Sequence, residues 1–168
     1  FRKLNTAVNA MIDGVRKNFF GRITYSKLGS GPDGGWTENV NWNELGFDFV
    51  GSDEYFAKAW YSREQKLRDL KDLRKYGLPV WVTEFGCCSY TNASQYGGSG
   101  IQRFKGEPYD EEEQARSVVE TISLFQEAGM DGIFLHQFLQ GRYAGSENYF
   151  GVVRSGEKTP DRRKLAFY

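Results

Sequence analysis

The stretch Pro79-Val80-Trp81-Val82-Thr83-Glu84-Phe85-Gly86 decides the fold and points to a site. Its apolar residues predict a β-strand, which ends in a carboxylate and then breaks at a glycine. A carboxylate at the end of a buried strand costs free energy unless it is paired or has a function. In folds built from alternating strands and helices, catalytic residues gather at the carboxyl ends of the strands. Glu84 is therefore a candidate catalytic residue, and the alternative is a structural acid paired with an arginine.

Composition excludes several classes of protein. The chain has 168 residues, enough for one domain with a hydrophobic core, and its 22 Lys and Arg balance its 22 Asp and Glu. Zero net charge argues against a nucleic-acid-binding protein, which usually has a basic excess. No apolar run approaches the roughly 18 residues that a membrane-spanning helix needs, so we predict no membrane partner.

The cysteines and the histidine argue against a metal site. Cys87 and Cys88 are adjacent, and His136 is the only histidine. Two neighbouring cysteines make neither a disulfide framework nor a four-ligand zinc site. We expect buried free thiols, with a strained vicinal disulfide as the alternative, and no metal or organic cofactor.

Hydrophobic periodicity predicts four strands that alternate with helices. Helices are expected over residues 3–18, from Ser62 to Gly77, from Asp110 to Gly129 and from Pro160, and strands over residues 22–26, 47–52, 79–85 and 131–138. This order indicates βαβ units and a parallel sheet, so the fold class is α/β. Nothing in the chain resembles a linker, and residues 1–168 are expected to belong to one domain.

Polar residues follow the last three of these strands. Asp53 and Tyr55 end one strand, Glu84 ends the next, and His136 with Gln137 ends the last. Because the carboxyl ends of parallel strands meet at one edge of a sheet, we expect these side chains to share one site.

Strict alternation along the strand that carries Glu84 would divide its side chains between two faces. It predicts Val80, Val82 and Glu84 on one face. Phe85 is expected on the opposite face, together with Trp81 and Thr83.

Several segments resemble the clan A glycoside hydrolases, which are (β/α)8 TIM barrels. Thr83-Glu84-Phe85-Gly86 is similar to the strand-seven motif that carries their nucleophile. The other similar segments are Arg22 to Ser26 (strand five), Phe47 to Phe56 (strand six), and Tyr149 to Val153 with Lys158 to Pro160 after strand eight. The nearest resemblance is to the small β-mannanase barrels of family 113, and bacterial barrels named abortive-infection proteins are also similar. The resemblance implies the C-terminal half of a barrel, strands five to eight.

The resemblance also implies a chemistry. It predicts retaining hydrolysis of β-glycosidic bonds in an oligo- or polysaccharide, with Glu84 as the nucleophile. Tyr55 is expected to hydrogen-bond Glu84 and hold it ionised, and Asp53, His136 and Gln137 are expected to bind sugar hydroxyls. The family's general acid/base ends strand four, which would precede the first residue of this chain. Many relatives carry a tryptophan where this chain has His136.

Aromatic residues on the loops are candidate sugar platforms. Aromatics make up 16 % of the chain, and Trp36, Trp42 and Tyr90 are predicted to lie on loops. Their rings are suited to stacking on sugar faces, and packing within the core or the loops explains them equally well.

Two further interpretations stay open. The chain is alternatively a non-catalytic barrel fragment, or pseudoenzyme, that binds a glycan or a protein, or a generic α/β domain in which Glu84 is structural. As a half-barrel it is expected to associate with an N-terminal half-barrel or with a second copy, because unpaired strand edges invite pairing.

Overall fold

The chain forms one parallel sheet with helices on one face. The computed structural model describes residues 2–29, 42–97, 108–139, 149–154 and 163–168. The strands are β1 (Ser26–Leu28), β2 (Val50–Asp53), β3 (Val80–Phe85) and β4 (Gly132–Leu135). All three strand pairings are parallel, and the strands lie in the order β1-β2-β3-β4. The predicted α/β class is confirmed.

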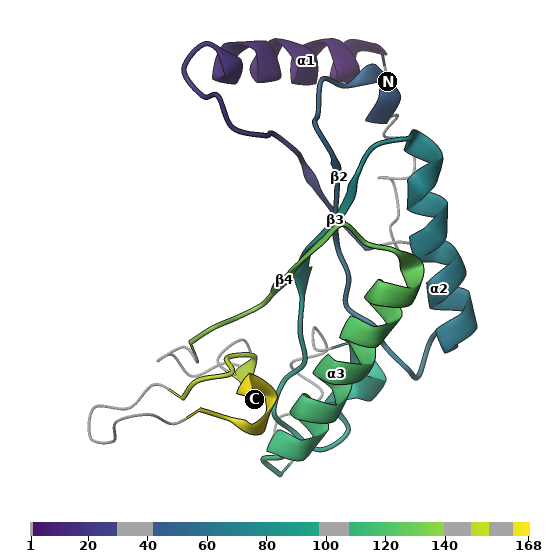
Figure 1. Cartoon of the computed structure of the whole chain (residues 1–168), viewed down its shortest axis with the longest axis vertical. Helices are drawn as coiled ribbons and strands as arrows, with labels where there is room; N and C mark the ends of the chain where they lie inside the picture. The colour runs from purple at the N-terminus through teal and green to yellow at the C-terminus, as the bar shows by residue number, and fades with distance from the viewer. Residues whose placement is uncertain (1, 30–41, 98–107, 140–148, 155–162) are drawn as a thin grey trace.

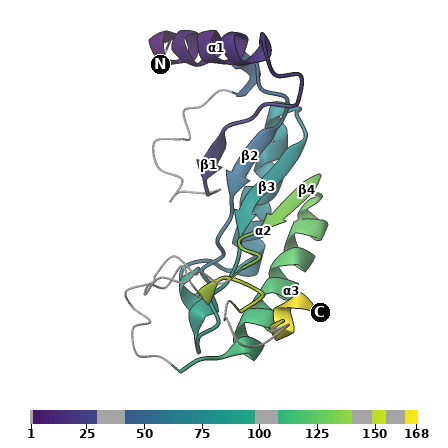
Figure 2. The same cartoon turned by 90° about the vertical axis from the view of Figure 1, so that its left-hand side faces the viewer.

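The helices are α1 (Arg2–Arg16), α2 (Arg63–Asp72) and α3 (Glu111–Ala128), with 3-10 turns η2 (Trp42–Glu44), η3 (Leu73–Tyr76), η4 (Ala93–Tyr96) and η7 (Leu165–Phe167). α2 and α3 pack on the same face of the sheet, whereas α1 lies across the amino ends of the strands (Figures 1 and 2). Within the described ranges, no helix is both long enough and apolar enough to cross a membrane.

The helix boundaries follow the capping signals in the sequence. The Ser62 side chain accepts a hydrogen bond of 3.1 Å from the Gln65 amide, and Asp110 accepts one of 2.9 Å from the Glu113 amide. Each bond satisfies an amide that the first turn of a helix leaves without a partner. α3 ends at Gly129, whose φ of 73° is a left-handed conformation that glycine adopts without strain.

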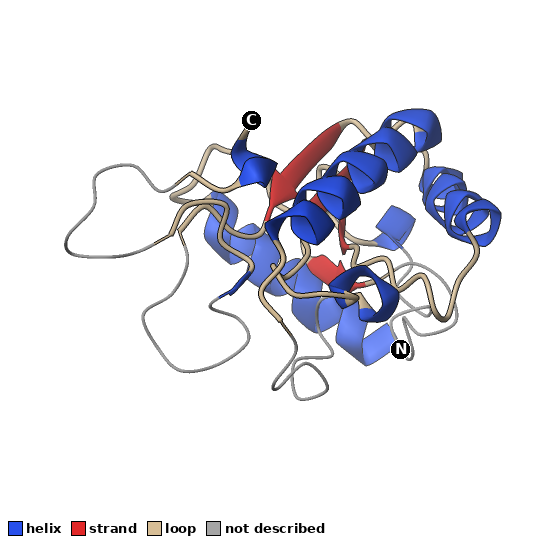
Figure 3. Cartoon of the chain, turned by 90° about the horizontal axis from the view of Figure 1, so that it is seen from below, coloured by secondary structure: helices blue, strands red, loops and turns tan. Residues whose placement is uncertain are grey.

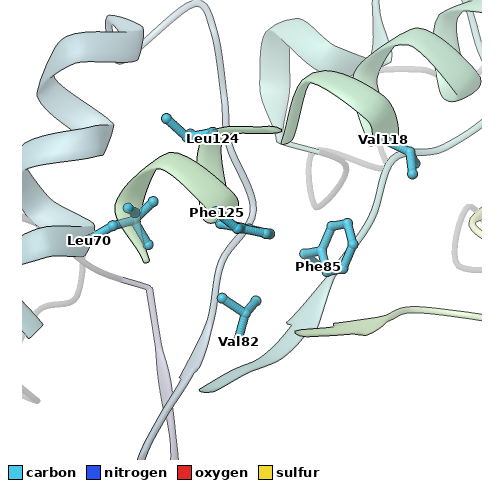
Figure 4. Close-up of a cluster of buried hydrophobic side chains, with 7 residues drawn as sticks. Leu70, Val82, Phe85, Val118, Leu124 and Phe125 are labelled. Atoms are coloured by element: carbon cyan, nitrogen blue, oxygen red, sulfur yellow. The ribbon is translucent and has the colours of Figure 1, made fainter. Parts of the chain in front are cut away.

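The main core lies between β3 and the two long helices. Its fully buried members are Leu70, Val82, Phe85, Val118, Leu124, Phe125 and Ala128 (Figure 4). The rings of Phe85 and Phe125 meet edge to face, with centroids 5.1 Å apart. Burying a side chain of this size contributes about 1.5–3 kcal/mol, so these contacts fix α3 on β3.

A bulge in β3 overturns the predicted strict alternation. In the register with β2, Ser52 pairs with Val82 but the next residue, Asp53, pairs with Glu84, so Thr83 is the extra residue. Phe85 consequently packs in the same core cluster as Val82 instead of facing the other way. The bulge inserts two consecutive polar side chains, Thr83 and Glu84, between core residues.

The first strand begins later than predicted. β1 starts at Ser26, and residues 22–25 form no ladder. Asp48 accepts a hydrogen bond of 2.6 Å from the Ile23 amide, and Thr24 donates one of 2.6 Å to the carbonyl of Phe49. Side chains therefore make two of the hydrogen bonds between this segment and the residues before β2, and the amide of Asp48 adds a backbone bond of 2.9 Å to the carbonyl of Ile23. At the C-terminus, the part of the expected helix that lies within the described residues is the 3-10 turn η7.

Candidate active site

Three predicted site residues meet at the carboxyl end of the sheet. The Tyr55 hydroxyl donates a hydrogen bond of 2.6 Å to Oε1 of Glu84, and Nδ1 of His136 lies 3.2 Å from the same oxygen. The side chains of Glu84 and His136 are 36 % and 32 % exposed, so solvent reaches both. We call Glu84, Tyr55 and His136 the Glu84 cluster.

Backbone hydrogen bonds beyond the strands hold the cluster together. The amide of Glu54 donates to the carbonyl of Glu84 at 2.7 Å, and the amide of His136 donates to the carbonyl of Phe85 at 2.7 Å. Each bond extends a parallel ladder by one residue, the first past the end of β2 and the second past the end of β4. Tyr55 and His136 are therefore delivered to opposite sides of the end of β3.

Gly86 and the ring of Phe150 hold His136 close to the end of β3. A side chain at Gly86 would place its Cβ 2.2 Å from the carbonyl oxygen of His136, so only glycine allows this approach. The ring of Phe150 contacts both Tyr55 and His136, with centroid separations of 5.7 and 5.3 Å. Phe150 thus packs against both partners of Glu84 and restricts their positions.

The local environment keeps the tyrosine protonated. Burial raises the pKa of Tyr55 far above its ordinary value, and the hydrogen bond to Glu84 and the nearby charges of Glu84 and Asp53 act in the same direction. The phenol therefore donates to the carboxylate throughout the neutral range. A fixed donor of this kind orients the carboxylate of Glu84.

Asp53 lies beside Glu84 in the sheet register but has partners of its own. Its Oδ1 accepts hydrogen bonds from the hydroxyls of Ser26, at 2.5 Å, and Thr83, at 2.8 Å. The two hydroxyl oxygens are 2.6 Å apart. Asp53 is therefore at the predicted end of the sheet, held in a polar group between β1 and β3.

The remaining predicted residues are placed as follows. Gln137 is half-buried next to His136, and its carbonyl accepts a hydrogen bond of 3.1 Å from the Val152 amide. Trp36 lies outside the described residues. Trp42 is 1 % exposed and packs against Phe47, so it is a core residue, in agreement with the packing alternative that the sequence left open.

Tyr90 is engaged by another aromatic ring. It is half-buried, and its ring centroid lies 4.4 Å from that of Tyr149. Packing within the loops therefore accounts for Tyr90, in agreement with the alternative that the sequence left open.

The two cysteines form no disulfide, and both are buried. Burial raises the pKa of each thiol to about 12, so neither Cys87 nor Cys88 forms a reactive thiolate near neutral pH. Among the described residues, no group of three or more His, Cys, Asp or Glu side chains is arranged to hold a metal ion.

Sequence reasoning missed the structural roles of Phe150 and of the hydroxyls of Ser26 and Thr83. The motif around Phe150 was visible in the sequence, but its contact with Tyr55 joins segments that are far apart in the chain. The contacts of Ser26 and Thr83 with Asp53 join three strands that are far apart in the chain.

Comparison with known proteins places the fold. No family model and no curated protein matches the chain. Among solved structures it is similar to the GH113 β-mannanase AaManA from Alicyclobacillus acidocaldarius in complex with ManMIm, with 19 % identity and a TM-score of 0.59 over 76 % of this chain and 38 % of that one.

Two further solved structures show the same likeness. A GH113 β-1,4-mannanase matches with 18 % identity and a TM-score of 0.62, over 79 % of this chain and 40 % of that one. A complex of a GH113 β-1,4-mannanase matches with 20 % identity and a TM-score of 0.59, over 76 % of this chain and 38 % of that one. The chain spans about two fifths of the length of these structures. It therefore has the fold of a partial (β/α)8 barrel, similar to the barrels of the family 113 β-mannanases.

Proposed function

We propose that the chain supplies the nucleophile of a retaining β-glycosidase that acts on a polysaccharide with a β-1,4-linked mannose backbone. The observation that carries the proposal is the 2.6 Å hydrogen bond from Tyr55 to Glu84 at the carboxyl end of β3. The substrate class follows the printed activity of the similar solved structures. Catalytic residues of such barrels lie at this end of the strands.

In the first step of this mechanism, Glu84 attacks the anomeric carbon. Oε1 is engaged by Tyr55 and His136, so Oε2 is the attacking oxygen. The bond from the anomeric carbon to the leaving oxygen breaks, and that oxygen takes a proton from a carboxylic acid. We assign this acid to the strand-four position of the family, which lies outside the chain.

In the second step, water attacks the glycosyl-enzyme and restores the Glu84 carboxylate. The water loses its proton to the carboxylate that served as the acid, so atoms and charge balance over the cycle. The two carboxyl groups of a retaining enzyme are about 5–5.5 Å apart. Asp53, His136 and Gln137 are assigned to the sugar hydroxyls, and Trp36 is assigned to a sugar face.

A substrate with a very good leaving group tests the nucleophile without the missing acid. A dinitrophenyl β-mannoside that carries fluorine next to the anomeric carbon needs no protonation of its leaving group. The fluorine slows both steps, and the good leaving group restores the rate of the first step alone, so the glycosyl-enzyme accumulates. Incubation with this chain is expected to release dinitrophenolate and to add the fluorinated sugar to the peptide that contains Glu84, as read by mass spectrometry.

Two variants sharpen the experiment. Glu84→Gln is nearly isosteric and is expected to show no adduct. Glu44→Gln changes an exposed glutamate at the opposite end of the sheet, where it contacts Asn5, and is expected to label like the wild type. An adduct on another carboxylate, or no adduct on the wild-type chain, would refute the assignment of Glu84 and favour a non-catalytic barrel fragment.

A further inference from the structure

One exposed tryptophan lies on the same face as the Glu84 cluster. Trp60 is in the loop that follows β2, and Tyr96 is in η4, within the loop that follows β3. Both loops leave the carboxyl ends of their strands, the face seen from below in Figure 3. Ligands of barrels bind at this face, so the position of Trp60 suits a binding residue.

The two aromatic side chains touch each other but stay accessible. Trp60 is 53 % exposed and Tyr96 is half-buried, with ring centroids 6.4 Å apart at an interplanar angle of 71°. Exposed apolar surface costs roughly 25 cal/mol per Å², and a tryptophan has much of it. By contrast, Trp42 is buried and Trp81 is half-buried between Phe49 and Phe134. Among the tryptophans that the structure describes, Trp60 has the most exposed ring.

The backbone beneath this pair is fixed. The amides of Lys58 and Ala59 donate to the carbonyls of Ser94 and Gln95, at 3.1 and 2.9 Å, and so join the two loops. The carbonyl of Ala57 accepts from two amides of the same turn, those of residues 60 and 61, at 3.0 and 3.1 Å. A rigid platform loses little conformational entropy when a ligand binds, which favours affinity.

The backbone that carries the platform packs closely against the backbone of Tyr55, a member of the Glu84 cluster. Gly97 follows Tyr96 directly, and a Cβ at Gly97 would lie 3.2 Å from the Cβ of Ala57 and 3.4 Å from the carbonyl oxygen of Tyr55. Its φ of 68° is also a conformation that favours glycine. The same short segment therefore carries the donor to Glu84 and, five residues later, the exposed ring of Trp60.

We propose that Trp60, supported by Tyr96, is an aromatic subsite on which a sugar ring of a β-linked polysaccharide stacks outside the Glu84 cluster. The apolar face of a pyranose ring matches an exposed indole in size and in its lack of hydrogen-bonding groups. Such a subsite adds affinity for long chains. It adds little for a disaccharide, because a disaccharide would be bound at the Glu84 cluster and would not reach Trp60. This inference names a binding residue for the proposed function and rests on that function for its class of ligand.

Retardation in a native gel that contains soluble β-1,4-mannan tests the subsite in the chain as it exists. The wild type is expected to migrate more slowly with rising polysaccharide concentration. Trp60→Ala is expected to weaken binding about tenfold or more, the loss typical of an aromatic anchor. Trp60→Tyr keeps a ring and is expected to recover most of the affinity. Phe20→Ala removes a ring that is 95 % exposed at the other end of the sheet and is expected to bind like the wild type.

The same variants separate this inference from the proposed function. Glu84→Gln is expected to keep the retardation while it loses the covalent adduct. A labelled Glu84 with unchanged retardation of Trp60→Ala would refute the subsite and leave the nucleophile in place. Retardation that depends on Trp60, in a chain that forms no adduct, would refute the nucleophile and keep the subsite. A wild-type chain that the polysaccharide does not retard would also refute the subsite.

Discussion

A buried lysine near the C-terminus gives a sharp prediction about stability. Lys164 is 0 % exposed, and its ammonium donates hydrogen bonds to the Ser89 hydroxyl at 3.0 Å and the Tyr149 carbonyl at 3.2 Å. Burial lowers its pKa from 10.5 to about 8, an effect that the charge of Glu111 opposes and that of Arg154 reinforces. Both of the hydrogen-bond acceptors named here are neutral, so they compensate the buried charge only in part.

The sign and size of the effect follow from linkage. Below about pH 8 the lysine is protonated in both the folded and the unfolded chain, and the folded chain bears the full cost of the buried charge. The difference between the two pKa values corresponds to about 3 kcal/mol. Between about pH 8 and about pH 10.5, the lysine is mostly deprotonated in the folded chain but still protonated in the unfolded chain. The free energy of unfolding therefore rises by about 2.5 kcal/mol between about pH 7 and about pH 10.

Urea unfolding of the wild type and of Lys164→Met measures this contribution. The other titrating groups are common to both proteins, so the difference between their free energies of unfolding isolates the lysine. We expect this difference to shift in favour of the wild type by about 2.5 kcal/mol from about pH 7 to about pH 10. Lys75→Met, at a lysine whose side chain is 55 % exposed, is the matched control and is expected to give a constant difference. A constant difference for Lys164→Met as well would refute the reasoning.

Three more predictions concern the site and the scaffold. Tyr55→Phe is expected to slow labelling of Glu84 by about tenfold to a hundredfold, because it removes a hydrogen bond to a charged group, while the urea midpoint stays within error of the wild type. Lys66→Met is expected to lower the free energy of unfolding in urea by about 3–5 kcal/mol, because it removes the ion-pair partner, at 2.6 Å, of Glu54, which is 0 % exposed. Adding Glu54→Gln is expected to recover part of this loss. Ser62→Ala is expected to cost about 1 kcal/mol through loss of the helix cap, and Ser62→Asp to restore it.

Local signals in the sequence were enough to predict much of the fold. The capping residues Ser62 and Asp110 begin helices where their patterns predicted, since a cap acts on amides only a few residues away. The alternation of helices and strands predicted the parallel sheet that the structure shows. The meeting of Tyr55, Glu84 and His136 was predictable for the same reason, because each residue ends a strand and parallel strands share their carboxyl edge.

Features that depend on the fit between distant segments were not predictable. The bulge at Thr83 is a mismatch of register between neighbouring strands, and a period-two pattern carries no trace of it. The tryptophans show the same limit. Trp42 stands between two asparagines and Trp60 between Ala59 and Tyr61, yet Trp42 is 1 % and Trp60 53 % exposed. Segments that are distant in the sequence set this difference, since the ring of Trp42 packs among those of Tyr25, Phe47 and Tyr76, whereas the ring of Trp60 meets that of Tyr96.

The inner face of the sheet and the chemistry that we propose for Glu84 point to the same requirement. Trp81 lies between Phe49 and Phe134 on the face away from α2 and α3, and Phe134 is still 52 % exposed. In a closed barrel this face is filled by side chains from all eight strands. A second copy of the chain would cover these rings but bring only another Glu84. An N-terminal half-barrel would cover them and also bring the strand-four carboxyl group, so that closure of the barrel and completion of the catalytic pair would be one event.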